Sequence, residues 1–567
     1  MNPPSSDSFE AASIRRDPPL ETRTMPPAPA SWPGWLLGGL ATAVYFATAA
    51  PGLGWYDSAE FTAAAATWGI PHAPGYPLYT LLAWIGCHGP FEPATVTNGL
   101  SVLAGGVSVS LAWFLGRRLG AGSAGASFGA ALLAVSPWLW ANATVTEVYA
   151  PGLCILLGVF LLLLKGRSKR SLLPVLLAAG LAGLGLGVHY MVATCGLGFA
   201  LLVFLHLPPP PLTGPGQAHL SRRLETSSWQ FGIRTAAACG LWAAAGASIN
   251  YALLSFRLAS DPAVNSLRGV AESNPVGWLM LGGNYRNWWG GEASVAISTK
   301  LAMLGTEFAL QLQIGCVLAG LGLLALWRAD RILCGSIVLA IAGNIAFFLQ
   351  YEVHDLENFF LPSLALLCIL AGRGLTWVQG EVSRRLPEQP SLPKAEWLLM
   401  LLPLLQLGSW SEFDRSDDDS PERYLESLDE SLPLSAVLIR TTLPREWQYD
   451  TLFTVWHQQA MGQRDDVRVL TRPLPTEAMK EAAREEIRMH AMLGRRIFVL
   501  HPDSAAAVGF QTAQAGSALE LVVPIETSPA HPPTTPPTHP VIPSHKTPPP
   551  ASSDGAPPGT NTPQGHP

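Results

Sequence analysis

The chain has 567 residues, of which 49% are hydrophobic and 13% charged, and its formal net charge at pH 7 is −6. A soluble domain normally carries about 25% charged residues, so this composition excludes an ordinary soluble enzyme and indicates a polytopic membrane protein. The seven cysteines have no paired spacing, which argues against a disulfide framework and against a zinc site.

Residues 1–31 are polar and proline-rich, and they predict a disordered cytoplasmic N-terminus without a signal peptide. Over residues 32–410, apolar runs of roughly 17 to 24 residues recur, close to the ~20 residues that a helix needs to cross a bilayer. We predict about eleven transmembrane helices, at 34–50, 95–115, 123–141, 149–164, 172–188, 191–206, 235–255, 308–327, 332–349, 358–377 and 395–410.

The basic residues predict which ends of these spans face the cytoplasm. Lys and Arg clusters precede the first span and then follow only even-numbered spans, so the N-terminus and the clusters share the cytoplasmic side. The opposite loops face outward and hold nearly all the unusual polar groups, namely Asp57, Glu60, His72, Glu147, His189, His354, Asp355 and Glu357. This segregation suggests one outward-facing polar cavity.

The first outer loop predicts two short helices beside the membrane. Ser58–Trp68 suits an amphipathic helix with Ser58 as its N-cap. Tyr76–Cys87 is apolar but too short to span, and it predicts an interfacial or re-entrant helix. Asp57 then has two interpretations. It is either a general base whose carboxylate lies near the bilayer, or a residue that caps the helix. In the second case Glu60 interacts favourably with the helix dipole at the N-terminus.

The two last segments lie beyond the bundle. Residues 411–523 are moderately polar and predict a small α/β domain on the outer side, with helices near Tyr424–Leu428 and Thr476–Met492 and short buried strands at Val437–Arg440, Val467–Leu470 and Ile497–Leu500. Residues 524–567 are rich in Pro, Thr, Ser and His and predict a disordered tail.

Several motifs resemble, in order, a family of membrane protein O-mannosyltransferases of the plexin-receptor type. They are Asp57-Ser58-Ala59-Glu60-Phe61 with Gly69-Ile70-Pro71-His72-Ala73-Pro74-Gly75-Tyr76-Pro77-Leu78, Thr146-Glu147-Val148-Tyr149-Ala150, Gly185-Leu186-Gly187-Val188-His189, and Tyr351 with Asp355, Glu357, Phe359 and Pro362. Weaker matches continue to about residue 470. Ala59, Ala73 and the stretch 445–451 depart from the family pattern, which puts the acceptor specificity of the outer domain in doubt.

The resemblance implies the GT-C glycosyltransferase fold. It also implies that a sugar, with mannose as the first candidate, is transferred from a polyprenyl-phosphate carrier to a protein or glycan acceptor. It implies that Asp57 is the catalytic base and that Glu60 positions the acceptor or holds His72. The candidate substrate-binding residues are His72, Tyr76, Glu147, Tyr149, His189, Asp355, Glu357 and Arg286. No cofactor and no nucleic-acid partner is predicted. The acidic residues could hold a metal ion, but no ligand spacing demands one, so metal dependence stays open. The expected location is a bacterial inner membrane, or the endoplasmic reticulum in a eukaryote.

Plainer interpretations stay open for these residues. His72 is either an ordinary loop residue or a donor to phosphate or sugar. Glu147, Tyr149 and His189 either face the cavity or pack between helices. Four cations of the outer loop are alternative partners for the phosphate, namely Arg257, Arg268, Arg286 and Lys300. At the level of the whole chain, the rivals are a transporter or lipid flippase and a non-catalytic scaffold. Clustering of polar groups at one face rather than at the midplane favours the transferase.

Overall fold

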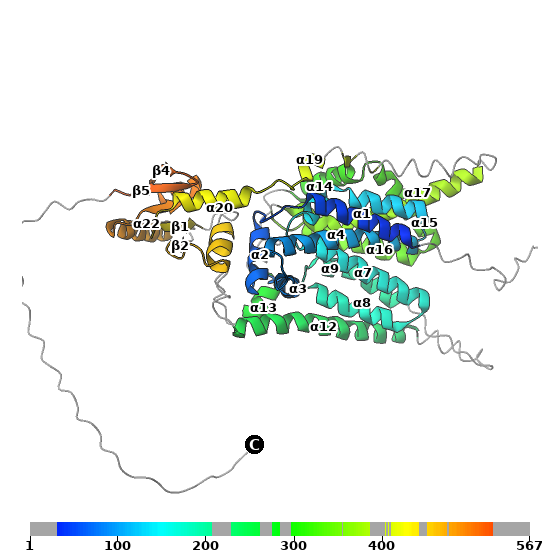
Figure 1. Ribbon diagram of the computed structural model, residues 1–567. Helices are drawn as coiled ribbons and strands as arrows, with labels where there is room; N and C mark the ends of the chain where they lie inside the picture. Colours follow the sequence, from blue (N-terminus) through cyan, green and yellow to red (C-terminus); the bar gives the residue numbers. More distant parts are fainter. Residues whose placement is uncertain are drawn as a thin grey trace, which may run out of the picture. The chain divides into compact units, whose positions relative to one another are not determined.

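A computed structural model describes residues 31–206, 228–260, 275–283, 296–353, 355–385, 403, 406–407, 410–441, 451–472 and 476–524. The described chain up to Val523 is one compact unit. Figure 1 shows a bundle of long helices on one side and a small sheet domain on the other, with α2 (Asp57–Thr67) and α3 (Pro77–Cys87) at the end of the bundle nearer the sheet.

The bundle consists of the following helices, besides α2 and α3: α1 (Trp32–Thr48), α4 (Pro93–Arg118), α5 (Ser123–Ala134), α6 (Pro137–Ala143), α7 (Tyr149–Lys169), α8 (Leu172–Gly185), α9 (Met191–Thr194), α10 (Gly196–His206), α12 (Ser228–Ser260), α13 (Pro275–Met280), α14 (Ile297–Leu312), α15 (Gly315–Ala329), α16 (Arg331–Phe348), the 3-10 helix η4 (Leu356–Phe360) and α17 (Leu361–Arg385).

In the described part of the chain, five helices are long and apolar enough to cross a membrane, and seven if two bent pairs each count as one span. The protein is therefore a multi-pass membrane protein. Ten of the eleven expected spans coincide with helices, although α1, α8 and α10 each have fewer than the 18 residues taken as the minimum for a span. The eleventh, 395–410, lies almost wholly outside the described residues, so the count of eleven stays a prediction.

Two expected spans are not straight helices. The expected span 308–327 is divided between α14 and α15, which meet at an angle of 96°, and Gln313 between them has a φ of 49°. The expected span 123–141 is divided between α5 and α6, which meet at 61° just before Pro137. Proline removes a helical hydrogen-bond donor and ends the first helix there.

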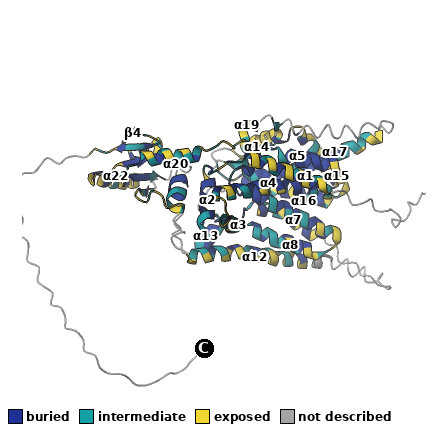
Figure 2. Ribbon diagram, viewed as in Figure 1, coloured by how far each residue is buried: buried dark blue, intermediate teal, exposed yellow. Residues whose placement is uncertain are grey.

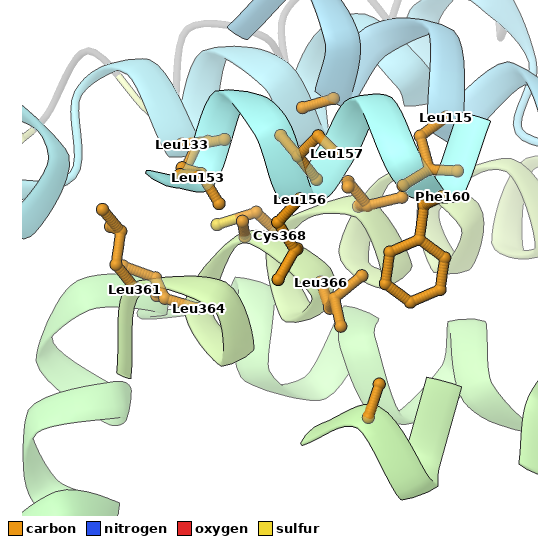
Figure 3. Packing of buried hydrophobic residues seen from close by; sticks show 14 of the residues in the cluster. Leu115, Leu133, Leu153, Leu156, Leu157, Phe160, Leu361, Leu364, Leu366 and Cys368 are labelled. Atoms are coloured by element: carbon orange, nitrogen blue, oxygen red, sulfur yellow. The ribbon is translucent and has the colours of Figure 1, made fainter. Parts of the chain in front are cut away.

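The core of the bundle lies between α4, α7 and α17, of which α17 is the most buried. Figure 3 shows Leu153, Leu156 and Phe160 of α7 facing Leu364 and Cys368 of α17. Small residues let neighbouring helices approach closely, as is common in membranes. A Cβ atom at Gly374 of α17 would lie 1.8 Å from the carbonyl oxygen of Leu318 in α15, so only glycine fits.

The outer domain contains a five-stranded mixed sheet in the order β2-β1-β3-β5-β4. Its strands are β1 (Val437–Thr441), β2 (Arg468–Arg472), β3 (Ile497–Val499), β4 (Gln511–Ala515) and β5 (Ala518–Val522). Its helices are α20 (Ser420–Ser431), the π-helix η7 (Thr451–Ala460), α22 (Glu477–Met492) and α23 (Pro502–Val508), whereas α19 (Trp410–Phe413) packs against α6 of the bundle. The helices and strands predicted for this domain are present, whereas the β4–β5 hairpin was not predicted.

The outer domain is fixed to the first outer loop by polar and apolar contacts. The backbone N–H of Leu53 donates to Glu422 of α20 at 2.6 Å, and the indole N–H of Trp55 donates to the Ser420 hydroxyl at 2.9 Å. The rings of Trp55 and Tyr424 lie 5.6 Å apart. Leu53 and Ala59 share a hydrophobic cluster with the inner face of the outer domain, so this domain and α2 form one continuous structure.

Candidate active site

The helix α2 begins at Asp57, directly after a residue with an unusual backbone. Tyr56 has a φ of 56° without being glycine, and it precedes the helix as its N-cap. Such left-handed residues persist only where the surrounding structure determines them, and they gather at functional sites. Ser58 was expected to be the N-cap, which is wrong: its hydroxyl donates to the Thr146 carbonyl at 2.6 Å. That bond ties α2 to the loop before α7.

Asp57, Glu60 and His72 come together in the first outer loop. Glu60 is entirely buried, and both of its oxygens accept from His72: the backbone N–H lies at 3.0 Å and ring Nδ1 at 2.6 Å. The other ring nitrogen, Nε2, lies 3.2 Å from the Tyr76 hydroxyl and 3.7 Å from the Asp57 carboxylate. The predicted contact of Glu60 with His72 is therefore present.

The burial of these three side chains differs in a way that matters for chemistry. His72 is only 7% exposed, whereas the Asp57 side chain is 32% exposed. A buried carboxylate is tolerated when it is paired and hydrogen-bonded, and His72 supplies this for Glu60. Asp57 is the most exposed of the three side chains and lies 3.7 Å from His72 of the buried pair.

The loop that carries His72 is held by helix ends and aromatic packing. The first N–H groups of α3, at Leu78 and Tyr79, both donate to the Gly187 carbonyl, at 3.0 and 3.1 Å. These are donors that a helix cannot satisfy internally. The Phe61 ring lies 5.5 Å from His72 and 4.9 Å from Tyr76. The loop after α8 is thereby placed beside the first outer loop.

A second polar group lies at the outer ends of α7 and α17. The Tyr149 hydroxyl donates to Asp355 at 2.6 Å, and the Tyr149 ring lies 4.9 Å from His189. His189 also stacks with Tyr76, at 6.4 Å between ring centres, which connects this group to the first. The ring Nδ1 of His189 accepts from the Met191 backbone N–H, so a neutral His189 carries its proton on Nε2.

Glu147 lies between the two groups, just before α7. Removal of its carboxyl group from water, then the negative charges of Asp57 and Asp355, raise the pKa of Glu147 well above the ordinary value. Tyr79, which the sequence analysis did not single out, is 1% exposed, and its hydroxyl makes no hydrogen bond within the described residues. The only advance signal for Tyr79 was its position in the helix that follows the His72 motif.

His189 gives the first testable expectation. Burial, and then the neighbouring His72, lower the pKa of His189 to about 3. The unfolded chain takes up this proton near pH 6.5 and the folded one does not, so stability falls as the pH drops from 6.5 towards 3, by at most about 1.4 kcal/mol per pH unit. Thermal unfolding at pH 7.5, 6.0 and 5.0 should show a smaller acid loss for His189→Gln. The exposed His88→Gln serves as the control, and equal losses in both variants would contradict the expectation.

Other predicted residues lie apart from these groups or outside the description. Glu357 is exposed at the start of η4. Lys300 is paired with Glu352 and donates to the Tyr351 carbonyl. The Arg257 guanidinium lies 4.7 Å above the Trp68 ring. Arg286, Arg268 and His354 lie outside the described residues.

A metal ion has one candidate set of ligands in the described residues. Asp57, Glu60 and His72 each offer one ligand atom, and these atoms lie within 4.8 Å of one another. Carboxylate oxygens and an imidazole nitrogen suit several divalent cations. Both ring nitrogens of His72 already face hydrogen-bond partners, so a cation would have to replace one of them.

The basic residues gather at the opposite end of the bundle. Arg117 and Arg118 end α4, Lys169 ends α7, and Arg384 and Arg385 end α17. The Arg118 guanidinium donates to the Ser168 hydroxyl, which joins the ends of α4 and α7. These cation clusters lie at the end of the bundle opposite to Asp57, Glu60 and His72, and the predicted orientation rests on their position.

Two sequence comparisons find relatives of this chain. Residues 57–209 match the family model described as the N-terminal domain of the Protein O-mannosyl-transferase TMEM260. The mouse (Mus musculus) Protein O-mannosyl-transferase TMEM260 is 25% identical over 410 residues, which are 68% of this chain and 56% of the mouse protein. The chain therefore spans little more than half the length of that relative.

A solved structure shows the same fold. ArnT from Cupriavidus metallidurans, crystallised with undecaprenyl phosphate, superposes with a TM-score of 0.51 and 13% identity, and the match covers 87% of this chain and 98% of that one. At this identity the likeness concerns the fold alone. The chain has the GT-C fold, in which a membrane helical bundle is followed by an outer domain.

Proposed function

We propose, from the resemblance of this chain to the protein O-mannosyl-transferase family represented by TMEM260, that it is an integral-membrane glycosyltransferase. It transfers a hexose, with mannose as the first candidate, from a polyprenyl phosphate to a hydroxyl group of an acceptor protein outside the membrane. The observation that carries the proposal is the partly exposed Asp57 carboxylate beside the buried His72–Glu60 pair, at one end of a GT-C bundle.

The proposed reaction needs one base and a stabilised leaving group. Asp57 accepts the proton of the acceptor hydroxyl while the hydroxyl oxygen forms a bond to C1 of the sugar. The bond between C1 and the phosphate oxygen breaks, and its electron pair leaves with the lipid phosphate. His72, held by Glu60, fixes the position of Asp57 and faces the same space through Nε2.

The sugar hydroxyls have candidate partners in the second polar group. Tyr149 and Asp355 are joined by a hydrogen bond and lie beside His189. A raised pKa keeps Glu147 protonated at higher pH than usual, so its carboxyl group can donate as well as accept. We assign the sugar to this group, with Tyr76 and Tyr79 as its walls. Two of the predicted cations remain candidates for binding the phosphate of the donor. They are Arg286, in the long outer loop, and Arg257, near the end of α12.

The membrane placement follows the same proposal. The N-terminus faces the cytoplasm and the outer domain faces the periplasm, because the cation clusters that end α4 and α7 lie away from the site. In a bacterium the membrane is the inner membrane, and in a eukaryote it is that of the endoplasmic reticulum.

One assay tests the function directly. Purified protein in lipid nanodiscs receives radiolabelled polyprenyl-phosphate mannose, and in parallel polyprenyl-phosphate glucose, with a periplasmic protein extract as acceptor. Labelled protein formed from either donor supports the transferase and identifies the sugar. No transfer from any lipid-linked sugar, together with movement of labelled lipid across the bilayer of proteoliposomes, would favour the transporter instead.

A further inference from the structure

We propose that the acceptor polypeptide binds in an extended conformation along the free edge of β4 and places a side chain in the pocket beside Trp55. The inference rests on the proposed function, because it assumes that the hydroxyl to be modified belongs to a polypeptide. It assigns a binding role to two features that the catalytic proposal does not use: an exposed sheet edge and a cavity between the outer domain and the first outer loop.

The strand β4 is an edge of the sheet in the described residues. It pairs with β5 in an antiparallel register from Gln511 opposite Val522 to Ala515 opposite Ala518. Four of its five residues are exposed. Because Ala515 and Ala518 close a two-residue turn as a hydrogen-bonded pair, the alternate residues Thr512 and Gln514 direct their N–H and C=O groups away from β5.

An unpaired edge of this kind is a template for another strand. Peptides that add a strand gain affinity from main-chain hydrogen bonds and specificity from pockets for alternate side chains. In β4, the polar side chains Gln511, Thr512 and Gln514 discourage the stacking of many copies while leaving the main-chain groups available. The edge therefore suits a single extended chain.

A pocket lies where the β4–β5 hairpin turns. Its volume is about 490 Å³, within the range of ligand sites in proteins. It is lined by Trp55, Ser420, Arg423, Tyr424, Ser427, Leu500 and Ser517. The Ser427 and Ser517 hydroxyls lie 2.5 Å apart, which fixes the hairpin turn against α20. Two aromatic rings with hydroxyl groups around them suit a side chain that is apolar at its centre and polar at its end.

The same pocket connects the sheet edge with the catalytic loop. Ser517 is the second residue of the turn between β4 and β5, whereas Trp55 stands two residues before Asp57 and accepts the Ser58 backbone N–H through its carbonyl at 3.2 Å. The pocket thus has the turn of the β4–β5 hairpin on one side and the loop that leads to Asp57 on the other. This arrangement gives the acceptor a path from the outer domain to the base.

The charges near the pocket favour a polypeptide over a lipid headgroup. Arg423, the cation in the lining, is paired with Asp419 at 2.8 Å. Four further acidic residues lie within six positions of it along the chain, Asp417, Asp418, Glu422 and Glu426. An anionic phosphate would be repelled by this surface, whereas a neutral or basic peptide would not.

The test measures peptide binding without any sugar donor. Full-length protein in nanodiscs is screened against an array of roughly twelve-residue, valine- and threonine-rich peptides that contain Ser or Thr, a length that covers one strand and its flanks. The tightest peptide is then labelled with fluorescein for anisotropy. Thr512→Pro removes an outward N–H and leaves the pairing with β5, as edge strands tolerate, whereas the control Thr512→Val keeps that N–H.

A second pair of variants tests the pocket. Ser427→Trp fills it, and Glu430→Trp adds the same bulk at an exposed position on the same helix. We expect Thr512→Pro and Ser427→Trp to weaken peptide binding about tenfold or more, and both controls to stay within about twofold. Thermal unfolding confirms that each variant is folded.

Several results would overturn the inference. One is a Kd above about 1 mM for every peptide; another is binding that neither Thr512→Pro nor Ser427→Trp changes. A dimer in mass photometry that only Thr512→Pro dissociates, with peptide binding intact, would give the edge to a second copy of the chain. Peptide binding that responds as expected, without sugar transfer, would count against the transferase and leave the peptide site standing.

Discussion

Asp57→Asn is expected to lower the rate of sugar transfer about 10²- to 10⁴-fold, the usual contribution of a positioned general base. Asparagine keeps the size of the side chain and its place at the start of α2, but it cannot take a proton from the acceptor hydroxyl. Because Asp57 is 32% exposed and its neighbour His72 is held independently by Glu60, the fold should be unaffected. The measurement is the initial rate of transfer from labelled polyprenyl-phosphate mannose, with thermal unfolding in parallel.

The matched control is Asp417→Asn, an exposed acid near α20 in the outer domain. Its transfer rate should stay within about twofold of wild type, since surface substitutions of this kind have small effects. Equal rates for wild type and Asp57→Asn would rule out the base assignment and would agree with a scaffold or a transporter. A raised KM with an unchanged kcat would make Asp57 a binding residue instead.

Glu60→Ala is expected to have the second largest effect, on both stability and activity. Glu60 is fully buried and accepts two hydrogen bonds from His72. Loss of one partner of a buried, hydrogen-bonded pair typically costs about 3–5 kcal/mol. The released His72 no longer fixes Asp57, so transfer should fall by roughly 10²-fold, the penalty for misplaced catalytic groups.

Glu60→Gln separates the two effects. Its amide oxygen can still accept from one donor of His72, so we expect an intermediate loss of stability and of activity. Glu426→Ala, an exposed glutamate on α20, is the control and should change stability by less than about 0.5 kcal/mol. A Glu60→Ala protein that unfolds at the wild-type temperature would show that the buried pair contributes nothing to the loop.

The centre of the site was predictable because it lies in one short motif. Asp57 and Glu60 stand at positions i and i+3, which places them on one face of a helix, and the prolines around His72 limit the path of the loop. Partners from distant segments were harder to see. Tyr149 and Asp355 are 206 residues apart and meet through a hydrogen bond, and no local pattern foretells such a pairing. The sugar-site assignment therefore depended on the resemblance.

The fold was predictable where length and hydropathy agree, as for α4, α7, α16 and α17. Hydropathy does not reveal a change of direction, because a sharp bend leaves the apolar character of a segment unchanged. The 96° turn between α14 and α15 was missed for this reason. The β4–β5 hairpin was missed because β4 is exposed and polar, so it lacks the buried alternation that marks a strand.

The helix α12 has a consequence for how this protein meets its membrane. Only 22% of an apolar 18-residue stretch of this helix is buried inside the protein, and Figure 2 shows exposed residues along its length. Yet its outer end, at Leu254 and Leu258, packs against Ile70 and Ala73 in the loop of His72. A helix that is solvated by lipid along most of its surface tilts when bilayer thickness changes. A change in acyl-chain length would thus tilt α12 and shift the loop of His72 that packs against it. The thickness of the bilayer would in this way affect the geometry of the site.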